Sequence, residues 1–164
     1  MGFPQKIRAS AAVASRARHE GVLPLAGMPR LRGLLADPEG SIEVQVAAAP
    51  DAGGQPTLTL KVDGALPLAC ERCGKTFRWP LAVGETLRLV HSDEEEARLL
   101  AECEPYRVED DWVPLHELVE DEVLLELPML PRCEACDNMR SGQPESPSAP
   151  SVRPNPFAQL KLKT

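Results

Sequence analysis

Residues 57–73 read TLTLKVDGALPLACERC, and the rest of the chain must fit around them. Their apolar side chains occupy even-numbered positions on both sides of Asp63-Gly64, from Leu58 to Leu68. An Asp-Gly pair is a strong hairpin signal, but a two-residue hairpin would shift the phase of this alternation. Because the phase continues to Cys70, the pattern favours one long strand that bends at Gly64.

Two further strands are predicted next to this one in the sequence. Residues 76–90 alternate in the odd phase, with Trp79 in a core position and Pro80 indicating an edge or a bulge. Residues 41–47 alternate with period two, as a half-buried strand does, and residues 50–56 form a loop. The prolines and glycines of residues 21–35 indicate an extended arm that lies on the sheet, with room for one short helical turn after Met28.

The best helical segment is residues 112–127, because Pro114 suits a first turn and Pro128 ends the helix. Glu122 falls within its apolar stripe, where a carboxylate needs a partner. Arg72 is one candidate, and the alternative is that Glu122 lies at the rim of the stripe. The predicted fold class is α+β, a small antiparallel sheet of long bent strands packed with one main C-terminal helix. The expected stripe consists of Leu115, Leu118, Val119, Val123 and Leu125.

Two cysteine pairs have the spacing of a metal site. Cys70 and Cys73 form one pair, and Cys133 and Cys136 form the other after 59 intervening residues. Two Cys-x-x-Cys pairs can supply the four ligands of a closed structural Zn²⁺ site. We therefore predict a zinc clasp between a strand end and a helix end. The alternatives are four reduced, partly buried cysteines, and a redox role for the first pair.

The remaining segments suggest four parts of the chain. Residues 1–20 form a basic N-terminal segment, interpreted as a short helix, with an organellar address as the alternative. Residues 21–137 form a single domain, in which residues 91–111 are an acidic loop with a short helix over 94–102. Residues 138–153 are a predicted disordered linker. Residues 154–164 are a predicted docking segment around Asn155, Pro156 and Phe157, with a capping helix on the domain as the alternative.

Charge is unevenly distributed along the 164 residues, whose net charge is −7. Residues 92–137 carry a net charge of −13, whereas residues 1–36 carry +5 and residues 138–164 carry +3. The acidic part repels phosphate, so we expect it to contact basic proteins. Any RNA should be contacted by the basic ends or through a partner protein. No stretch approaches the ~20 apolar residues of a membrane span. The odd number of cysteines, five, favours a reducing compartment.

The sequence contains no recognisable catalytic set. His19, His91 and His116 lie apart, and no Ser/His/Asp, Cys/His or phosphate-binding glycine pattern is discernible. We therefore predict a protein that is not an enzyme and has no small-molecule substrate.

Three motifs in order resemble the bacterial YceD family, the large ribosomal RNA subunit accumulation proteins. They are Cys-x-Arg-Cys-Gly-Lys at 70–75, Val-Glu-Asp-Glu-Val-Leu-Leu-Glu-Leu-Pro at 119–128 before a cysteine-bearing turn, and Pro-Asn-Pro-Phe-Ala at 154–158. The resemblance covers residues 20–164. One departure is Pro131-Arg132-Cys133, where relatives often have a histidine before the last cysteine. The positions that match the family motif are Cys70, Arg72, Cys73, Glu122, Pro128, Cys133 and Cys136.

The resemblance implies a cytoplasmic, non-enzymatic protein needed for accumulation of 23S ribosomal RNA. Its expected partners are ribosomal precursors or assembly proteins, with rRNA contacted through the basic termini. The alternative is a zinc-ribbon-like adaptor that mediates protein interactions in transcription or another assembly.

Overall fold

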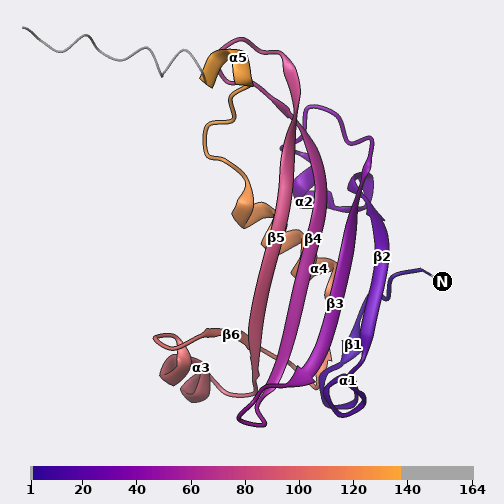
Figure 1. Cartoon of the computed structure of the whole chain (residues 1–164), viewed down its shortest axis with the longest axis vertical. Helices are drawn as coiled ribbons and strands as arrows, with labels where there is room; N and C mark the ends of the chain where they lie inside the picture. The colour runs from indigo at the N-terminus through magenta and orange to yellow at the C-terminus, as the bar shows by residue number, and fades with distance from the viewer. Residues whose placement is uncertain (1, 138–164) are drawn as a thin grey trace, which may run out of the picture.

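A computed structural model describes residues 2–137. Their largest element is a five-stranded sheet with the order β2-β3-β4-β5-β6 (Figure 1). Neighbouring strands from β2 to β5 are antiparallel, and β6 is parallel to β5. The α+β class and the sheet of long strands are confirmed, but the sheet is not wholly antiparallel. The strands are β2 (Arg18–Pro24), β3 (Ser41–Pro50), β4 (Pro56–Ala69), β5 (Thr76–Val90) and β6 (Glu104–Arg107).

The long strand β4 passes through Asp63-Gly64 without interruption. It pairs with β5 from Thr57, opposite Arg88, to Ala69, opposite Thr76. The prediction of one strand in place of a hairpin is therefore confirmed. Gly64 lies so close to β3 that a Cβ atom there would be 2.9 Å from Ile42 Cγ2. The unbroken alternation buries Leu58, Leu60, Val62, Leu66 and Leu68 on one face.

The helix α4 (Leu115–Glu126) covers that apolar face (Figure 1). It begins at Leu115 because Trp112 and Val113 form a short strand, β7, so the predicted start at Trp112 is wrong. Leu125 is 77% exposed, which contradicts its predicted place in the apolar stripe. The buried side of α4 is turned toward Glu120, because the short helix α2 (Pro29–Arg32) packs there.

Residues 2–20 contribute to the core. Strand β1 (Ile7–Arg8) pairs with β7 (Trp112–Val113), and helix α1 (Ala9–Ser15) follows. Phe3, Ile7 and Ala12 are buried with the rest of the core. The segment therefore contains a short helix as expected, but α1 itself carries no basic residue, and the segment belongs to the packed structure and does not merely precede it.

The expected arm over residues 21–35 is partly wrong. Residues up to Pro24 belong to β2, which forms one edge of the sheet by pairing with β3, because the segment satisfies its backbone hydrogen bonds there. The 3₁₀ helix η1 (Leu25–Gly27) and α2 follow, which agrees with the single turn expected after Met28.

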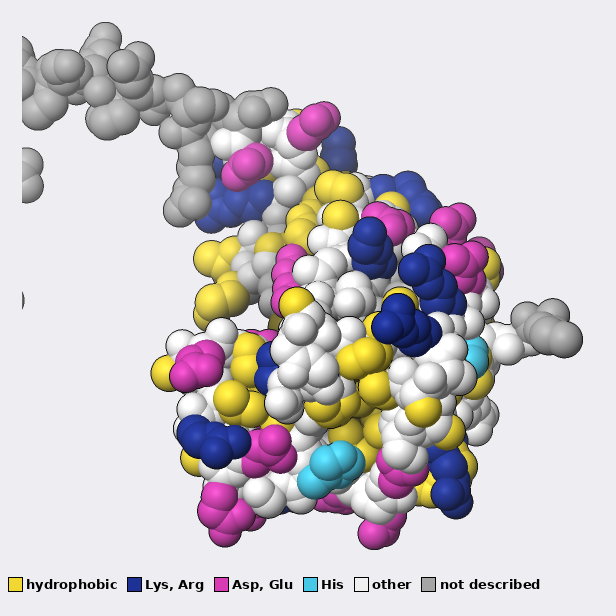
Figure 2. Space-filling model, turned by 60° about the horizontal axis from the view of Figure 1, so that its bottom comes forward, with side chains coloured by type: hydrophobic (Ala, Val, Ile, Leu, Met, Phe, Trp, Pro, Cys, Tyr) yellow, Lys and Arg dark blue, Asp and Glu magenta, His cyan; other side chains and the backbone are white. Residues whose placement is uncertain are grey.

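The acidic passage contains α3 (Asp93–Leu99), as expected, with the Ser92 side chain accepting a hydrogen bond from the Glu95 backbone N–H. Viewed from the end near α1 and α3, basic, acidic and hydrophobic side chains are interspersed on the surface (Figure 2). None of the described helices is long and apolar enough to cross a membrane. The predicted linker, 138–153, and docking segment, 154–164, lie outside the described residues.

Candidate metal centre

The first cysteine pair lies in the tight turn between β4 and β5. The backbone N–H of Cys70 donates to the Lys75 carbonyl (2.9 Å), and the N–H of Gly74 donates to the Cys70 carbonyl (2.8 Å). Gly74 has φ = +71°, a conformation that glycine adopts at little cost. This turn ends β4 with the Cys70 side chain buried and the Cys73 side chain exposed.

The second pair lies at the short helix α5 (Glu134–Asp137), with Cys133 directly before it and Cys136 within it, and Figure 1 shows α5 beside the β4–β5 turn. The Cys133 carbonyl accepts hydrogen bonds from the N–H groups of Cys136 and Asp137, both at 2.9 Å. The two turns are joined directly, because the Glu71 N–H donates to the Pro131 carbonyl (2.9 Å). Both Cys-x-x-Cys turns are thus held by backbone hydrogen bonds.

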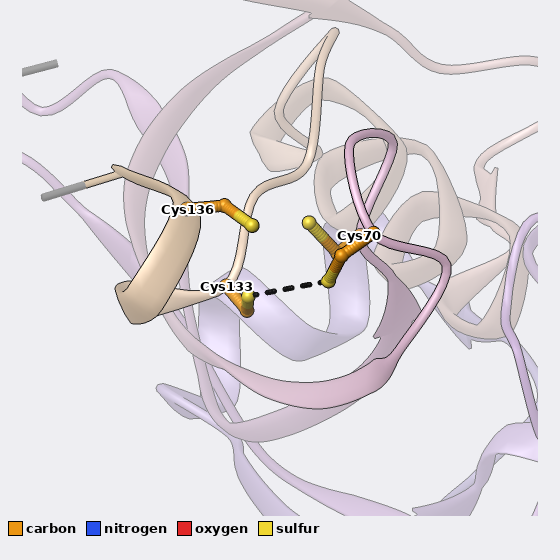
Figure 3. Close-up of side chains that lie close together, drawn as sticks. Cys70, Cys133 and Cys136 are labelled. Atoms are coloured by element: carbon orange, nitrogen blue, oxygen red, sulfur yellow. Dashed lines mark hydrogen bonds between the residues drawn. The ribbon is translucent and has the colours of Figure 1, made fainter. Parts of the chain in front are cut away.

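The four cysteine sulfur atoms, from Cys70, Cys73, Cys133 and Cys136, all lie within 4.8 Å of one another. The Sγ atoms of Cys73 and Cys133 are 3.7 Å apart. Thiolates at ~2.3 Å from a tetrahedral Zn²⁺ would be about 3.8 Å apart. Figure 3 shows the side chains of Cys70, Cys133 and Cys136 turned toward a common space. The cluster could therefore hold a metal ion, and its donor set and spacing fit Zn²⁺.

The protonation of the cluster depends on which side chain the backbone N–H groups face. The N–H groups of Cys133 and Cys73 point at the Cys70 thiol and lower its pKa to about 6. Burial, together with the neighbouring thiols, raises the pKa of Cys136 to about 12. Four thiolates so close together repel one another, so full deprotonation needs a bound cation. A closed set of four sulfurs leaves no open coordination position for water and suits a structural role.

The other predicted motif residues, Arg72, Glu122 and Pro128, are not part of this cluster. Arg72 is exposed in the first turn, and Pro128 is half-buried just after α4. The ion pairs within residues 2–137 do not include Arg72 with Glu122. Glu122 is half-buried at the rim of the apolar stripe, which was the alternative interpretation.

A buried carboxylate, Glu120, lies outside the predicted sites and is 4% exposed. Its Oε1 accepts hydrogen bonds from the backbone N–H groups of Arg30 (2.7 Å) and Leu31 (3.0 Å), and its Oε2 accepts one from the Arg30 side chain (3.2 Å). Burial acts to raise the pKa of Glu120, but these donors outweigh it and hold the pKa below its usual value. Glu120 therefore ties α4 to the first turn of α2. The sequence offered one signal for this contact. Pro29 is typical of a helix start, and the free backbone N–H groups at a helix start need an acceptor.

A comparison with known families supports the motif resemblance. Residues 58–163 match the family described as large ribosomal RNA subunit accumulation protein YceD. The match includes all four clustered cysteines and begins within β4, so residues 20–57 lie outside it. No solved structure matches the chain. Because the match spans more than half of the sequence, this chain belongs to the YceD family of large ribosomal RNA subunit accumulation proteins.

Proposed function

We propose that this protein is a non-enzymatic, cytoplasmic ribosome biogenesis factor. It would be required for the synthesis, processing or stability of 23S rRNA, and hence for its accumulation. The observation that carries this proposal is the family match over residues 58–163, which includes both cysteine turns and α4. The absence of a recognisable catalytic set in the sequence is consistent with an adaptor role.

We further propose that Cys70, Cys73, Cys133 and Cys136 bind one structural Zn²⁺. Support comes from the chemistry of the donors and the separation of 3.7 Å between the Cys73 and Cys133 sulfurs. When bound, the metal would supply the positive charge that lets all four thiols ionise. The protein's own residues would then hold the β4–β5 turn against α5 and present a rigid end of the sheet to a partner.

The charge distribution supports a division of labour among partners. The acidic residues 92–137 would contact basic ribosomal precursors or assembly proteins, since a net charge of −13 attracts basic surfaces and repels phosphate. The rRNA would be contacted through the basic termini. In the N-terminal segment, two cations lie over the Trp112 ring. Lys6 Nζ is 4.4 Å and the Arg8 guanidinium carbon 5.1 Å from the ring centre, so both make cation–π contacts with Trp112.

Deletion of the gene, followed by complementation, tests the proposed function. We expect the deletion strain to accumulate less 23S rRNA and fewer large subunits, with both restored by the wild-type chain and by Cys103→Ser. Cys73→Ser should restore them poorly, because it removes a proposed metal ligand. Normal 23S rRNA and normal large-subunit levels in the deletion strain would contradict the proposal.

Affinity purification from growing cells, with RNA and protein both analysed, tests the proposed partners. Ribosomal precursors or assembly proteins should be recovered with the chain. Recovery of RNA polymerase without ribosomal precursors would instead support an adaptor role in transcription and contradict the proposed function.

A further inference from the structure

The end of α4 and the segment after it expose an apolar patch, which we define as Leu125, Met129 and Leu130. Their exposed fractions are 77%, 98% and 63%. These three residues are half of the large hydrophobic residues that are exposed within residues 2–137. The other three, Val22, Leu34 and Leu100, are scattered elsewhere. Single exposed apolar residues are ordinary, but a group of them beside a charged rim indicates an interaction surface.

Carboxylates lie beside this patch on α4, and most of them have no cationic partner among the described residues. Glu122 lies about one helical turn before Leu125 and Glu126, and four other carboxylates are near enough to act on it. Burial, followed by the negative charges of these neighbours, raises the pKa of Glu122. Of these four neighbours, only Asp121 forms an ion pair within the described residues, and its partner is Arg30. The four neighbours are Glu85, Glu104, Asp121 and Glu126.

One segment of the same chain has the complementary composition. Residues 154–164 contain Phe157, Leu160 and Leu162, interleaved with Lys161 and Lys163, and no acidic residue. Large apolar side chains would cover the patch, while the lysines would neutralise the surrounding carboxylates. A second copy of the protein would present another acidic rim and would be repelled.

We propose that residues 154–164 dock in cis on the patch formed by Leu125, Met129 and Leu130, with Lys161 and Lys163 facing Glu122 and its carboxylate neighbours. The docking itself does not depend on the proposed function.

The length of the intervening chain permits this contact. Asp137 is eight residues beyond Met129, so the two cannot be more than about 28 Å apart. Residues 138–153 provide 16 residues, which span up to roughly 53 Å when extended and have a mean span of roughly 22 Å when they behave as a flexible coil. A tether matched to the distance raises the effective concentration of its end to the millimolar range. Weak apolar and ionic contacts are then sufficient for docking.

Nuclear magnetic resonance of the full-length, zinc-loaded chain tests the docking. We expect amides 157–163 in the wild-type protein to be as restricted as those of the folded domain. Leu125→Ser should release them, and Phe157→Ala should both release them and shift the Met129 methyl signal. The Met28 methyl, which is buried elsewhere, should not shift. Added salt should weaken the docking, since part of it is ionic.

Matched controls separate docking from general effects. Leu100→Ser removes an equally large side chain that is 65% exposed outside the patch, and Gln159→Ala changes a polar residue inside the segment. Both should leave amides 157–163 restricted. Freely mobile amides in the wild-type chain, or no response to Leu125→Ser, would overturn the proposal. A restriction that disappears on dilution would show that a second copy occupies the patch, and would overturn it as well.

Discussion

At the scale of single residues, Cys103 makes the metal proposal testable, because it is the only cysteine outside the cluster. Its thiol lies 3.8 Å from the Leu99 carbonyl within the acidic region. We predict that native mass spectrometry finds one zinc per wild-type chain and per Cys103→Ser chain. Cys73→Ser should lose most of its zinc at equal chelator concentration, because three thiolates and a hydroxyl bind Zn²⁺ more weakly than four thiolates. Equal zinc content in both variants would refute the assignment of Cys73 as a ligand.

Glu120 gives a second prediction at this scale. Glu120→Ala leaves the backbone N–H groups of Arg30 and Leu31 without their acceptor, and should lower the free energy of unfolding by about 2–4 kcal/mol. Glu120→Gln keeps an acceptor and should lose less. Arg30 is half-exposed, so its ion pair adds little. Urea denaturation of the three proteins provides the comparison, and a Glu120→Ala variant as stable as wild type would contradict this account.

The same carboxylate predicts a direction of pH dependence. The pKa of Glu120 is lower in the folded protein than its ordinary value of 4.5, so the unfolded chain binds a proton more readily. Its contribution to stability is therefore complete at neutral pH and is lost as the pH falls below about 4.5 through the folded-state pKa. Denaturation midpoints measured from pH 7 to pH 3 should converge for wild type and Glu120→Gln. A difference that grows as the pH falls would contradict the assignment.

Glu120 and Glu122, two of the four glutamates of α4, show what a sequence pattern alone does not specify. Projection around the helix placed Glu122 within the apolar stripe, but a projection contains no information about the neighbouring element. The packing of α2 against one side of α4 turned the buried arc toward Glu120 and left Leu125 exposed. The cysteine positions were predictable because their spacing alone specifies a ligand pair.

At the scale of elements, Gly64 decides how closely β3 and β4 approach. A methyl group at this position would lie 2.9 Å from Ile42 Cγ2, and Ile42 is fully buried. Gly64→Ala should therefore lower the free energy of unfolding by about 1–3 kcal/mol. Gly84→Ala is the matched control in β5, where nothing lies within 4 Å, and it should be neutral or slightly stabilising. Urea unfolding measures both, and equal stabilities would contradict the close packing.

Long strands were predictable and short ones were not. β4 and β5 contain 14 and 15 residues, so their alternation extends over many positions and identifies the phase. β1 and β7 contain only two residues each, which is too few to show a period. β6 is held by pairing with the end of β5, and its sequence, Glu-Pro-Tyr-Arg, contains no alternation of its own. Tertiary contacts thus define the elements that the sequence did not reveal.

At the scale of the whole molecule, the cysteine cluster closes a loop of about 60 residues between Cys73 and Cys133. A covalent link over such a loop stabilises by about 4 kcal/mol through the lost freedom of the unfolded chain, and a metal clip can approach this value. We predict that chelation lowers the Tm of wild-type protein, with recovery on addition of Zn²⁺. The same chelator should leave the Tm of Cys73→Ser almost unchanged. An unchanged Tm of the wild-type protein after verified zinc removal would contradict a structural role.

The meeting of the two cysteine turns was predictable only as a consequence of ligand chemistry. Nothing in residues 74–132 specifies that the chain returns to its starting point, and the hydrogen bond from Glu71 to Pro131 has no sequence signature. The contribution of residues 2–20 to the core was also not predictable. Their basic side chains indicate a solvent-exposed segment, although Phe3, Ile7 and Ala12 are buried. Local patterns identify elements, whereas the closure of a fold depends on which surfaces remain to be buried.

The pairing of β1 with β7 has a consequence for how the chain acquires its shape during translation. Ile7 faces Val113, and the Ala9 N–H donates to the Asp111 carbonyl, so the first strand finds its partner only after more than a hundred further amino acids have been polymerised. At roughly 5–20 residues per second this interval lasts about 5–20 s. Throughout it, Phe3 and Ile7 have no finished core to enter, and a nascent chain stalled before residue 113 should remain sensitive to protease near its beginning.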